Sequence, residues 1–247
     1  TDSVPLCDHA HARLGVTTDS LFWGIDLGGT KIEVALCDPA KPAEALLRRR
    51  CETEAHRGYG HIISQITSLV IQAEELSGQK RPARIGIATP GAVDPPTGEL
   101  KNSNTTCLNG RPLRADLAAV LGCEMAMAND ANCFTLAEAL WGAGRGEKVV
   151  LGLILGTGVG GGICIEGKVL NGRHGIAGEW GHNPIPGEDS PCYCGRCGCV
   201  ETVIAGPSLE RFYRESGGEN LRLPAIHQRA VDGAVSYTHL TLPTILL

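Results

Sequence analysis

The pattern of hydrophobic and polar positions first predicts a β-hairpin early in the chain. Residues 21–27 and 31–37 are apolar segments of strand length, and Gly-Gly-Thr at 28–30 separates them. Glycine tolerates the backbone conformations that tight turns require, so this pattern is typical of a hairpin. The same plan returns at 149–155 and 159–165, around a Gly-Thr-Gly turn. Two such hairpins predict a duplicated α/β architecture, although two unrelated hairpins would give the same pattern.

Between the hairpins, helical periods alternate with short apolar runs. In residues 61–76 the apolar positions recur about every three to four residues, the period of a helix with one buried face. We expect further helices at 113–121 and 132–141, and strands at 84–88 and 124–128. This alternation of strands with helices predicts an α/β fold.

Composition describes a globular chain with an excess of glycine. Of the 247 residues, 43% are hydrophobic, 20% are charged and 33 are glycine, where average usage is about 7%. The net charge of −5 argues against a nucleic-acid surface built on positive charge. The longest uncharged run, 149–165, contains six glycines, and it is shorter than the ~20 residues of a spanning helix. We therefore expect neither a nucleic-acid partner nor a membrane partner.

Cysteine usage and the two ends of the chain predict its compartment and domains. Residues 1–20 lack the apolar core of a signal peptide, and seven of the 11 cysteines lie singly in apolar surroundings, so we expect a cytoplasmic protein. Residues 235–247 resemble translated sequencing-adapter read-through and are expected to be a non-native tail; an ordinary C-terminal strand is the alternative. The expected domains are an N-terminal extension at 1–20, a first lobe at 21–128, a second lobe at 129–234 and that tail.

The turns of both hairpins are candidate phosphate sites. The run from Gly156 to Gly161 satisfies G-x-G-x-x-G, but a strand rather than a helix follows it, so the dinucleotide interpretation fails. A Walker A motif is absent from the sequence. What remains are turns that offer N–H groups and threonine hydroxyls to an anion. Their residues are Gly28, Gly29, Thr30, Gly156, Thr157 and Gly158.

Two charged residues flank the first of these turns. Asp26 would hold a hydrated Mg²⁺ beside the phosphates, and Lys31 would add a positive charge. The alternative for either turn alone is an ordinary glycine hairpin, with Asp26 as a turn residue. Because two turns of one plan occur together, the sequence favours nucleotide binding.

Cysteines and a histidine crowd together later in the chain. They are His182, Cys192, Cys194, Cys197 and Cys199. Three thiolates and one imidazole form the closed tetrahedral site that is typical of structural zinc, so five candidates leave one cysteine spare. A disulfide pair or a redox relay is the alternative, but a reducing compartment and the histidine favour zinc.

Five motifs, taken in order, carry a resemblance to a known family. They are Asp26-Leu27-Gly28-Gly29-Thr30-Lys31, Asn129-Asp130-Ala131-Asn132, Gly156-Thr157-Gly158-Val159-Gly160, Glu179-Trp180-Gly181-His182 and Cys192-x-Cys194-Gly195-x-x-Gly198-Cys199-x-Glu201. Over about residues 21–215 the chain resembles the ROK family of bacterial sugar kinases, which implies the duplicated two-lobe, actin-like ATPase (ribonuclease H-like) fold. Segments 101–105 and 108–110 are most like the fructokinase (manno/fructokinase) branch, while 111–117 resembles N-acetylglucosamine kinases.

The resemblance implies an ATP-dependent kinase that phosphorylates the terminal 6-hydroxyl of fructose, mannose or glucose, with N-acetylglucosamine as the alternative substrate. It implies ATP, Mg²⁺ and structural Zn²⁺ as cofactors. Asp130 would accept the proton of the sugar hydroxyl; local sequence alone leaves a helix N-cap as its alternative role. The other implied sugar ligands are Asn104, Asn129, Glu179, His182 and Glu201. The implied zinc ligands are His182, Cys192, Cys194 and Cys199, which leaves Cys197 as the spare.

Part of the family pattern finds no match in the chain. After about residue 220 there is no counterpart of the family's glycine-rich adenosine-binding segment, so we expect a C-terminally truncated protein with an incomplete second lobe. Two other functional classes stay open. A sugar-sensing transcriptional repressor of ROK type would need a helix-turn-helix domain, for which the roughly twenty residues before the first strand are too few. A non-catalytic sugar-binding remnant is the other, and a homodimer is also left open.

Overall fold

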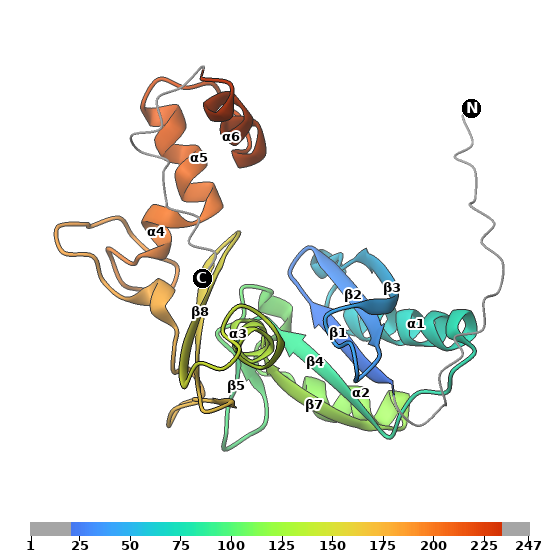
Figure 1. Cartoon of the computed structure of the whole chain (residues 1–247). Helices are drawn as coiled ribbons and strands as arrows, with labels where there is room; N and C mark the ends of the chain where they lie inside the picture. Colours follow the sequence, from blue (N-terminus) through green and yellow to red (C-terminus); the bar gives the residue numbers. More distant parts are fainter. Residues whose placement is uncertain (1–20, 234–247) are drawn as a thin grey trace, which may run out of the picture. The chain divides into compact units, whose positions relative to one another are not determined.

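The computed structural model describes residues 21–233, so the expected extension at 1–20 and the expected tail at 235–247 lie outside the described residues. The chain divides into two compact units, Thr1–Asp130 and Ala131–Leu247. Figure 1 labels their helices and strands and colours them along the sequence, from blue to red. Within residues 21–233, none of the helices combines the length and the apolar character that crossing a bilayer requires.

The first unit is built on a five-stranded sheet with the order β3-β2-β1-β4-β7. Strands β1, β2 and β3 are antiparallel neighbours, whereas β1, β4 and β7 run parallel. Strands β5 and β6 form a separate two-stranded ribbon. The bounds are β1 Phe22–Leu27, β2 Lys31–Cys37, β3 Ala45–Glu52, β4 Arg84–Thr89, β5 Ala92–Val93, β6 Leu100–Lys101 and β7 Glu124–Asn129.

Two helices and the sheet enclose the core of the first unit. Buried and exposed residues alternate along β1, as the hairpin pattern predicts, and α1 (Tyr59–Ser77) and α2 (Leu113–Leu121) each bury one face. The side chains of Leu27, Ile66 and Leu117 are at most 1% exposed, and burying each contributes roughly 1.5–3 kcal/mol. Short 3-10 turns lie at Ala55–Arg57 and Thr106–Leu108.

One strand and the starts of two helices differ most from the sequence-based expectation, and several other element ends differ from it by one residue. Strand β3 was not expected, because three consecutive arginines interrupt its apolar pattern. It forms an edge strand through its pairing with β2, and an ion pair between Arg48 and Glu33 links the two strands. Helix α1 begins at Tyr59 rather than 61, and the Tyr59 hydroxyl donates to Asp116 of α2 at 2.6 Å. Helix α3 begins at Asp130 rather than 132.

The second unit repeats the antiparallel opening of the first in a three-stranded sheet with the order β10-β9-β8. Both predicted strands of its hairpin have the expected bounds. The elements are α3 Asp130–Trp141, β8 Val149–Leu155, β9 Val159–Ile165, β10 Lys168–Val169, a 3-10 turn at Trp180–His182, α4 Glu201–Ile204, α5 Gly206–Glu215 and α6 Leu223–Val231. Its buried hydrophobic cluster is small and consists of Val159, Val200 and Ala205.

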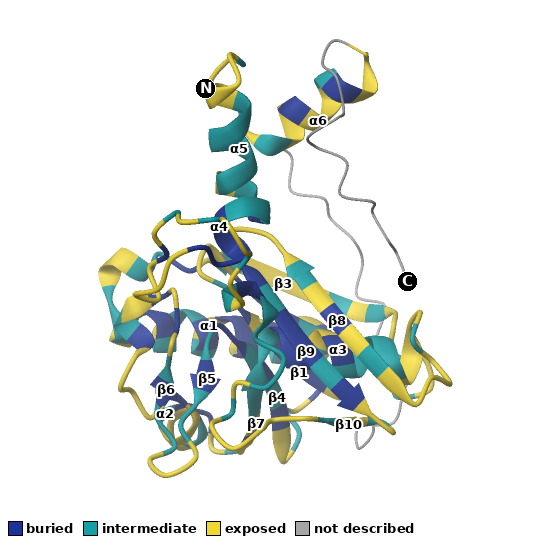
Figure 2. Ribbon diagram, turned by 90° about the vertical axis from the view of Figure 1, so that its left-hand side faces the viewer, coloured by how far each residue is buried: buried dark blue, intermediate teal, exposed yellow. Residues whose placement is uncertain are grey.

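The two faces of β8 differ sharply in burial. On one face Gly152 lies against Thr135 of α3, where a Cβ on the glycine would stand 2.1 Å from the threonine hydroxyl oxygen. The other face carries a row of exposed apolar side chains, visible in Figure 2 as yellow positions along β8 beside the buried β9. They are Val149, Leu151, Leu153 and Leu155.

Candidate functional site

The candidate residues of the first unit come from the carboxyl ends of its parallel strands. The register places Asp26 of β1 opposite Ala88 of β4, and Ala88 opposite Ala128 of β7. Gly28 and Asp130 therefore both lie two residues beyond one row of the sheet. In open α/β sheets, ligands bind beyond this edge.

The turn after β1 is closed by its own backbone and held from outside by Thr53. The Gly28 N–H donates to the Lys31 carbonyl at 2.9 Å. The buried Thr53 lies one residue beyond β3, and its hydroxyl donates to the Gly28 carbonyl at 2.7 Å. The Thr53 N–H donates to the Thr30 carbonyl at 2.9 Å. One residue thus engages two carbonyl groups of the turn.

The same turn touches the loop that carries Asn104. A Cβ added to Gly29 would lie 3.3 Å from the Thr105 hydroxyl oxygen and 3.8 Å from Asn104 Oδ1. The Asn109 side chain holds this loop, because it accepts from the Ser103 N–H at 2.9 Å and donates to the Ser103 carbonyl at 3.0 Å. A predicted phosphate residue and a predicted sugar residue are therefore direct neighbours.

Asn129 and Asp130 lie where β7 gives way to α3. The Asn129 side-chain amide donates to the Gly91 carbonyl at 2.9 Å, and both residues are half-buried. Asp130 is the first residue of α3, not a residue flanking it. A carboxylate in the first helical turn interacts favourably with the helix dipole.

The charged and hydroxyl groups near the two turns are accessible. Asp26 lies on the exposed face of β1; partial loss of hydration raises the pKa of its carboxyl, which Lys31 opposes and Glu33 reinforces. A cation close to this carboxylate would favour its ionised form, as Lys31 does. Thr30 and Thr157, one in each turn, are exposed.

The second glycine turn, between β8 and β9, is held by other segments of its own unit. The Gly156 N–H donates to the Gly158 carbonyl at 2.9 Å, and the Gly206 N–H donates to the Gly156 carbonyl at 2.8 Å. Glu201 is buried, and its Oε2 accepts from the Val159 N–H at 2.8 Å. Glu201, expected as a sugar ligand, therefore braces this turn with one of its carboxylate oxygens.

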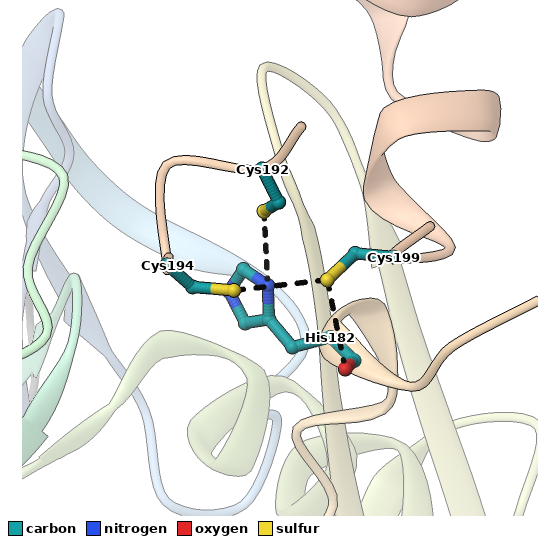
Figure 3. A group of neighbouring side chains, drawn as sticks. All are labelled: His182, Cys192, Cys194 and Cys199. Carbon is teal, nitrogen blue, oxygen red and sulfur yellow. Dashed lines mark hydrogen bonds between the residues drawn. The ribbon is translucent and has the colours of Figure 1, made fainter. Parts of the chain in front are cut away.

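Figure 3 shows the cluster of His182, Cys192, Cys194 and Cys199, whose ligand atoms all lie within 4.8 Å of one another. Cys192 Sγ is 3.6 Å from His182 Nδ1, and Cys194 Sγ is 3.7 Å from Cys199 Sγ. Tetrahedral zinc, with Zn–S bonds of about 2.3 Å and Zn–N bonds of about 2.0 Å, would separate its ligands by about 3.6–3.8 Å. A disulfide would need about 2.05 Å between sulfurs. The four side chains therefore fit a zinc ion.

The pKa values of the three cysteines in this cluster differ. Burial raises the pKa of Cys192, and burial together with the neighbouring cysteines raises the pKa of Cys199 to about 12. Although burial opposes it, hydrogen bonds from Arg196 lower the pKa of Cys194 to about 7. Without a metal ion, Cys192 and Cys199 are therefore neutral thiols, and a bound cation would favour the thiolate forms that ligate zinc. Cys197 is exposed and lies outside the cluster that the described residues form.

The 3-10 turn at Trp180–His182 fixes the histidine, and its two ring nitrogens face different partners. Gly181 packs so closely on β9 that a Cβ there would stand 2.0 Å from the Val159 carbonyl oxygen. His182 Nδ1 faces Cys192, while Nε2 lies 3.2 Å from the Tyr193 hydroxyl. A partner on the second nitrogen orients a metal-binding histidine. Glu179, half-buried, directly precedes this turn.

Several of these contacts involve residues that the sequence did not single out: Thr53, Asn109, Tyr193 and Gly206. The sequence shows that Tyr193 lies between two cysteines and that Thr53 follows a short run of residues that forms a strand. The sequence does not show their hydrogen-bond partners, Gly28 and His182, because these lie 25 and 11 residues away along the chain.

Comparison with known proteins identifies the relatives of this chain. The family model described as the ROK family matches residues 22–241. An N-acetylgalactosamine kinase of Shewanella sp. (strain ANA-3) is 37% identical over 81% of this chain and 65% of its own length. An N-acetyl-D-glucosamine kinase of Pectobacterium atrosepticum is 38% identical over 83% of this chain and 69% of its own. A ROK family glucokinase from Streptomyces griseus, solved in complex with glucose and AMPPNP, is 31% identical with a TM-score of 0.70, over 79% of this chain and 61% of that one.

The chain thus spans about two thirds of the length of the relatives that it matches. Its fold is the actin-like ATPase fold that the sequence motifs implied, with the antiparallel opening present in both units. The match over residues 22–241 and the identities above 30% agree with the motifs, and the chain belongs to the ROK family.

Proposed function

We propose that this protein is an ATP-dependent sugar kinase that transfers the γ-phosphate to the terminal 6-hydroxyl of an N-acetylhexosamine or a hexose. Both curated relatives named above phosphorylate amino sugars, according to their names, and the solved relative binds glucose with an ATP analogue. We therefore place N-acetylglucosamine and N-acetylgalactosamine before fructose, mannose and glucose. The similarity to the fructokinase branch stays a prediction.

One observation carries this proposal: the contact between the first glycine turn and the Asn104 loop. A Cβ on Gly29 would stand 3.3 Å from the Thr105 hydroxyl oxygen, tighter than an ordinary contact, and 3.8 Å from Asn104 Oδ1, within van der Waals contact. Phosphoryl transfer depends on placing an acceptor hydroxyl next to a phosphate, more than on covalent help from the protein. A turn that offers N–H groups, next to a loop that offers a carboxamide, meets this requirement within one unit.

Each candidate site residue of the first unit then has a proposed role. The turn at Gly28, Gly29 and Thr30 binds the phosphates, with Lys31 as an accessible positive charge, while Asn104 and Asn129 orient the sugar. Asp130 accepts the proton of the attacking hydroxyl as the bond to phosphorus forms. Asp26 holds a hydrated Mg²⁺ through water, and the bound ion neutralises phosphate charge.

The second unit contributes further proposed residues. Gly156, Thr157 and Gly158 form its phosphate turn, and the proposed sugar ligands are Glu179, His182 and Glu201. Zinc held by His182, Cys192, Cys194 and Cys199 supplies a structural crosslink, since four protein ligands leave no open position for chemistry. The resulting activity is that of a cytoplasmic enzyme of sugar metabolism.

ADP release in the presence of each of the five sugars tests the proposal. We expect turnover on at least one sugar, and Asp130→Asn should lower kcat by about 10²–10⁴-fold, the usual contribution of a general base. Sugar binding measured by calorimetry should survive in this variant. Asp232→Asn is a matched control, because Asp232 is an exposed residue at the end of α6.

One result would overturn the kinase assignment, and another the role of Asp130. A folded, zinc-loaded chain that binds a sugar without releasing ADP would be a non-catalytic sugar-binding protein. Equal turnover by Asp130→Asn and the wild type would remove Asp130 from the role of base.

A further inference from the structure

We propose that Thr53 is a positioning residue for nucleotide phosphates: it draws the carbonyl groups of the first glycine turn away, so that the turn presents N–H groups to an anion. The inference rests on the phosphate-binding role proposed above for residues 28–30. It concerns a side chain that lies 23 residues beyond the turn in sequence and that no glycine motif includes.

The geometry of the sheet brings Thr53 to this position. The last register pair of β2 and β3 joins Lys31 to Glu52, so the next residue of β3 emerges beside Thr30. There the Thr53 hydroxyl donates to the Gly28 carbonyl at 2.7 Å, and its N–H donates to the Thr30 carbonyl at 2.9 Å. Thr53 is fully buried, so water has no access to replace the hydroxyl.

Because peptide units are planar, these two hydrogen bonds also fix the directions of two N–H groups of the turn. In a trans peptide the N–H points opposite to the C=O of the same unit. Holding the Gly28 carbonyl toward Thr53 therefore directs the Gly29 N–H away from Thr53, and holding the Thr30 carbonyl does the same for the Lys31 N–H. N–H groups that point to the same side of a turn attract an anion, whereas a carbonyl on that side would repel a phosphate.

In the second glycine turn, one carbonyl group is likewise held from outside the turn, and another is held by the turn's own backbone. Its Gly156 carbonyl accepts from the Gly206 N–H at 2.8 Å, and its Gly158 carbonyl accepts from the Gly156 N–H at 2.9 Å. In both turns, two carbonyl groups are engaged by donors within their own unit. In the first turn, one of the two donors is a side-chain hydroxyl, which a point substitution can remove.

The test compares Thr53→Val, which removes the hydroxyl at nearly constant shape, with Thr53→Ser, which keeps it. Calorimetry would measure the Kd of Mg²⁺-AMPPNP and, separately, of the preferred sugar. We expect Thr53→Val to weaken nucleotide binding about tenfold, which corresponds to about 1.4 kcal/mol. The sugar Kd should change less than threefold, and Thr53→Ser should bind the nucleotide within about threefold of wild type.

Thr67→Val is the matched control. The Thr67 hydroxyl also donates to a backbone carbonyl, that of Ile63 at 2.8 Å within α1, so this variant loses a comparable bond away from the turn. It should keep wild-type nucleotide affinity. Amide exchange of residues 28–31 adds a readout that needs no ligand, and it should rise in Thr53→Val but not in Thr67→Val.

The outcomes separate the inference from the proposed function. Wild-type nucleotide affinity and turn exchange in Thr53→Val would overturn the inference and leave the kinase proposal standing. Equal losses of sugar and nucleotide binding would also overturn it, because they would indicate general loosening of the unit. Failure of the wild-type protein to bind Mg²⁺-AMPPNP would overturn the proposed function, and the inference with it.

Discussion

Gly29 shows at the scale of a single residue how the two halves of the proposed site depend on each other. The first glycine turn and the Asn104 loop are so close that a methyl group on Gly29 would have to displace the Thr105 hydroxyl by a few tenths of an ångström. Thr105 is buried, so it has little freedom to move. The sugar loop and the phosphate turn should therefore respond together to one added atom.

We expect Gly29→Ala to raise the KM for both ATP and the sugar by about three- to tenfold, since a small misplacement of reacting groups is costly. Steady-state kinetics with each substrate varied would measure this. Gly60→Ala is the matched control, because Gly60 lies in α1 with open space around it and alanine favours a helix. A sugar KM that Gly29→Ala leaves unchanged would contradict the coupling.

At the scale of single residues, the sequence predicts those site residues whose residue type and local spacing are distinctive. Glycines in turns, Asp130 and the cysteines at short spacing are visible because residue type and local spacing carry the information. Thr53 and Asn109 are ordinary polar residues, and their roles arise only when the fold brings distant backbone groups to them. No local pattern identifies such partners.

Among the elements, the ends of α1 and α2 are joined by one arginine. Arg81 donates to both carboxylate oxygens of Glu74 in α1, at 2.8 and 2.6 Å, and to the carbonyl of Leu121 in α2 at 2.8 Å. Hydrogen bonds from Arg81 are the largest influence on Glu74 and hold the pKa of its carboxyl below the ordinary value. Such a group stabilises the fold above its ordinary pKa of about 4.3 and stops doing so as pH falls through its lowered pKa.

Glu74→Gln should therefore lower the free energy of unfolding by about 1–3 kcal/mol near pH 7, the usual range for hydrogen bonds to charged groups. The difference from wild type should shrink as the pH falls below about 4, because Glu74 then becomes protonated as well. Denaturant unfolding at a series of pH values would measure it. Glu75→Gln, at an exposed neighbouring position, is the control; a pH-independent effect at Glu74 would contradict the ion-pair account.

The elements that the sequence predicts are those with a clear period or a hairpin turn. Strands β8 and β9 have the expected bounds. The glycine run after the turn continues as strand β9 rather than as a helix, as its apolar context indicated. Strand β3 was missed because its place is set by pairing with β2 rather than by its own pattern. Helix α5 was also not expected, although its sequence carries two signals of a helix: Pro207 in the first turn, and an apolar face formed by Leu209, Phe212 and Tyr213.

In the whole molecule, the two units differ in how much core they contain. Among the described residues, the first unit buries side chains from the sheet, α1 and α2 in one large cluster. The buried cluster of the second consists of three residues, with Trp180, Ile185 and Ile204 packed against them. A structural metal contributes most where the apolar core is small. Zinc removal should therefore destabilise the second unit and leave the first unit folded.

Hydrogen exchange before and after chelation would test this. We expect protection to fall around His182 and Cys199 while β1 and α1 keep theirs, and Cys199→Ser should reproduce the effect. Cys197→Ser is the matched control, because Cys197 is exposed and outside the cluster. Equal effects of the two serine variants would argue against the proposed ligand set.

The two-lobe fold itself could be predicted because the hairpin plan occurs twice and the five family motifs follow one another in a fixed order. The pairing of the strands could not, since β4 and β7, both expected as strands, join the first sheet through parallel pairing between segments far apart in sequence. Parallel pairs have no turn that would mark them locally.

The row of apolar side chains on β8 has a consequence for the protein in concentrated solution. β8 is the last strand of its sheet in the described part of the chain, so its outer edge offers backbone donors and acceptors next to Val149, Leu151 and Leu155. Natural edge strands usually carry charges or prolines that discourage pairing with another chain. β8 has neither, and its sequence is Val-Val-Leu-Gly-Leu-Ile-Leu. Within residues 21–233, this strand is therefore a segment that favours aggregation, and Leu151→Lys should improve solubility.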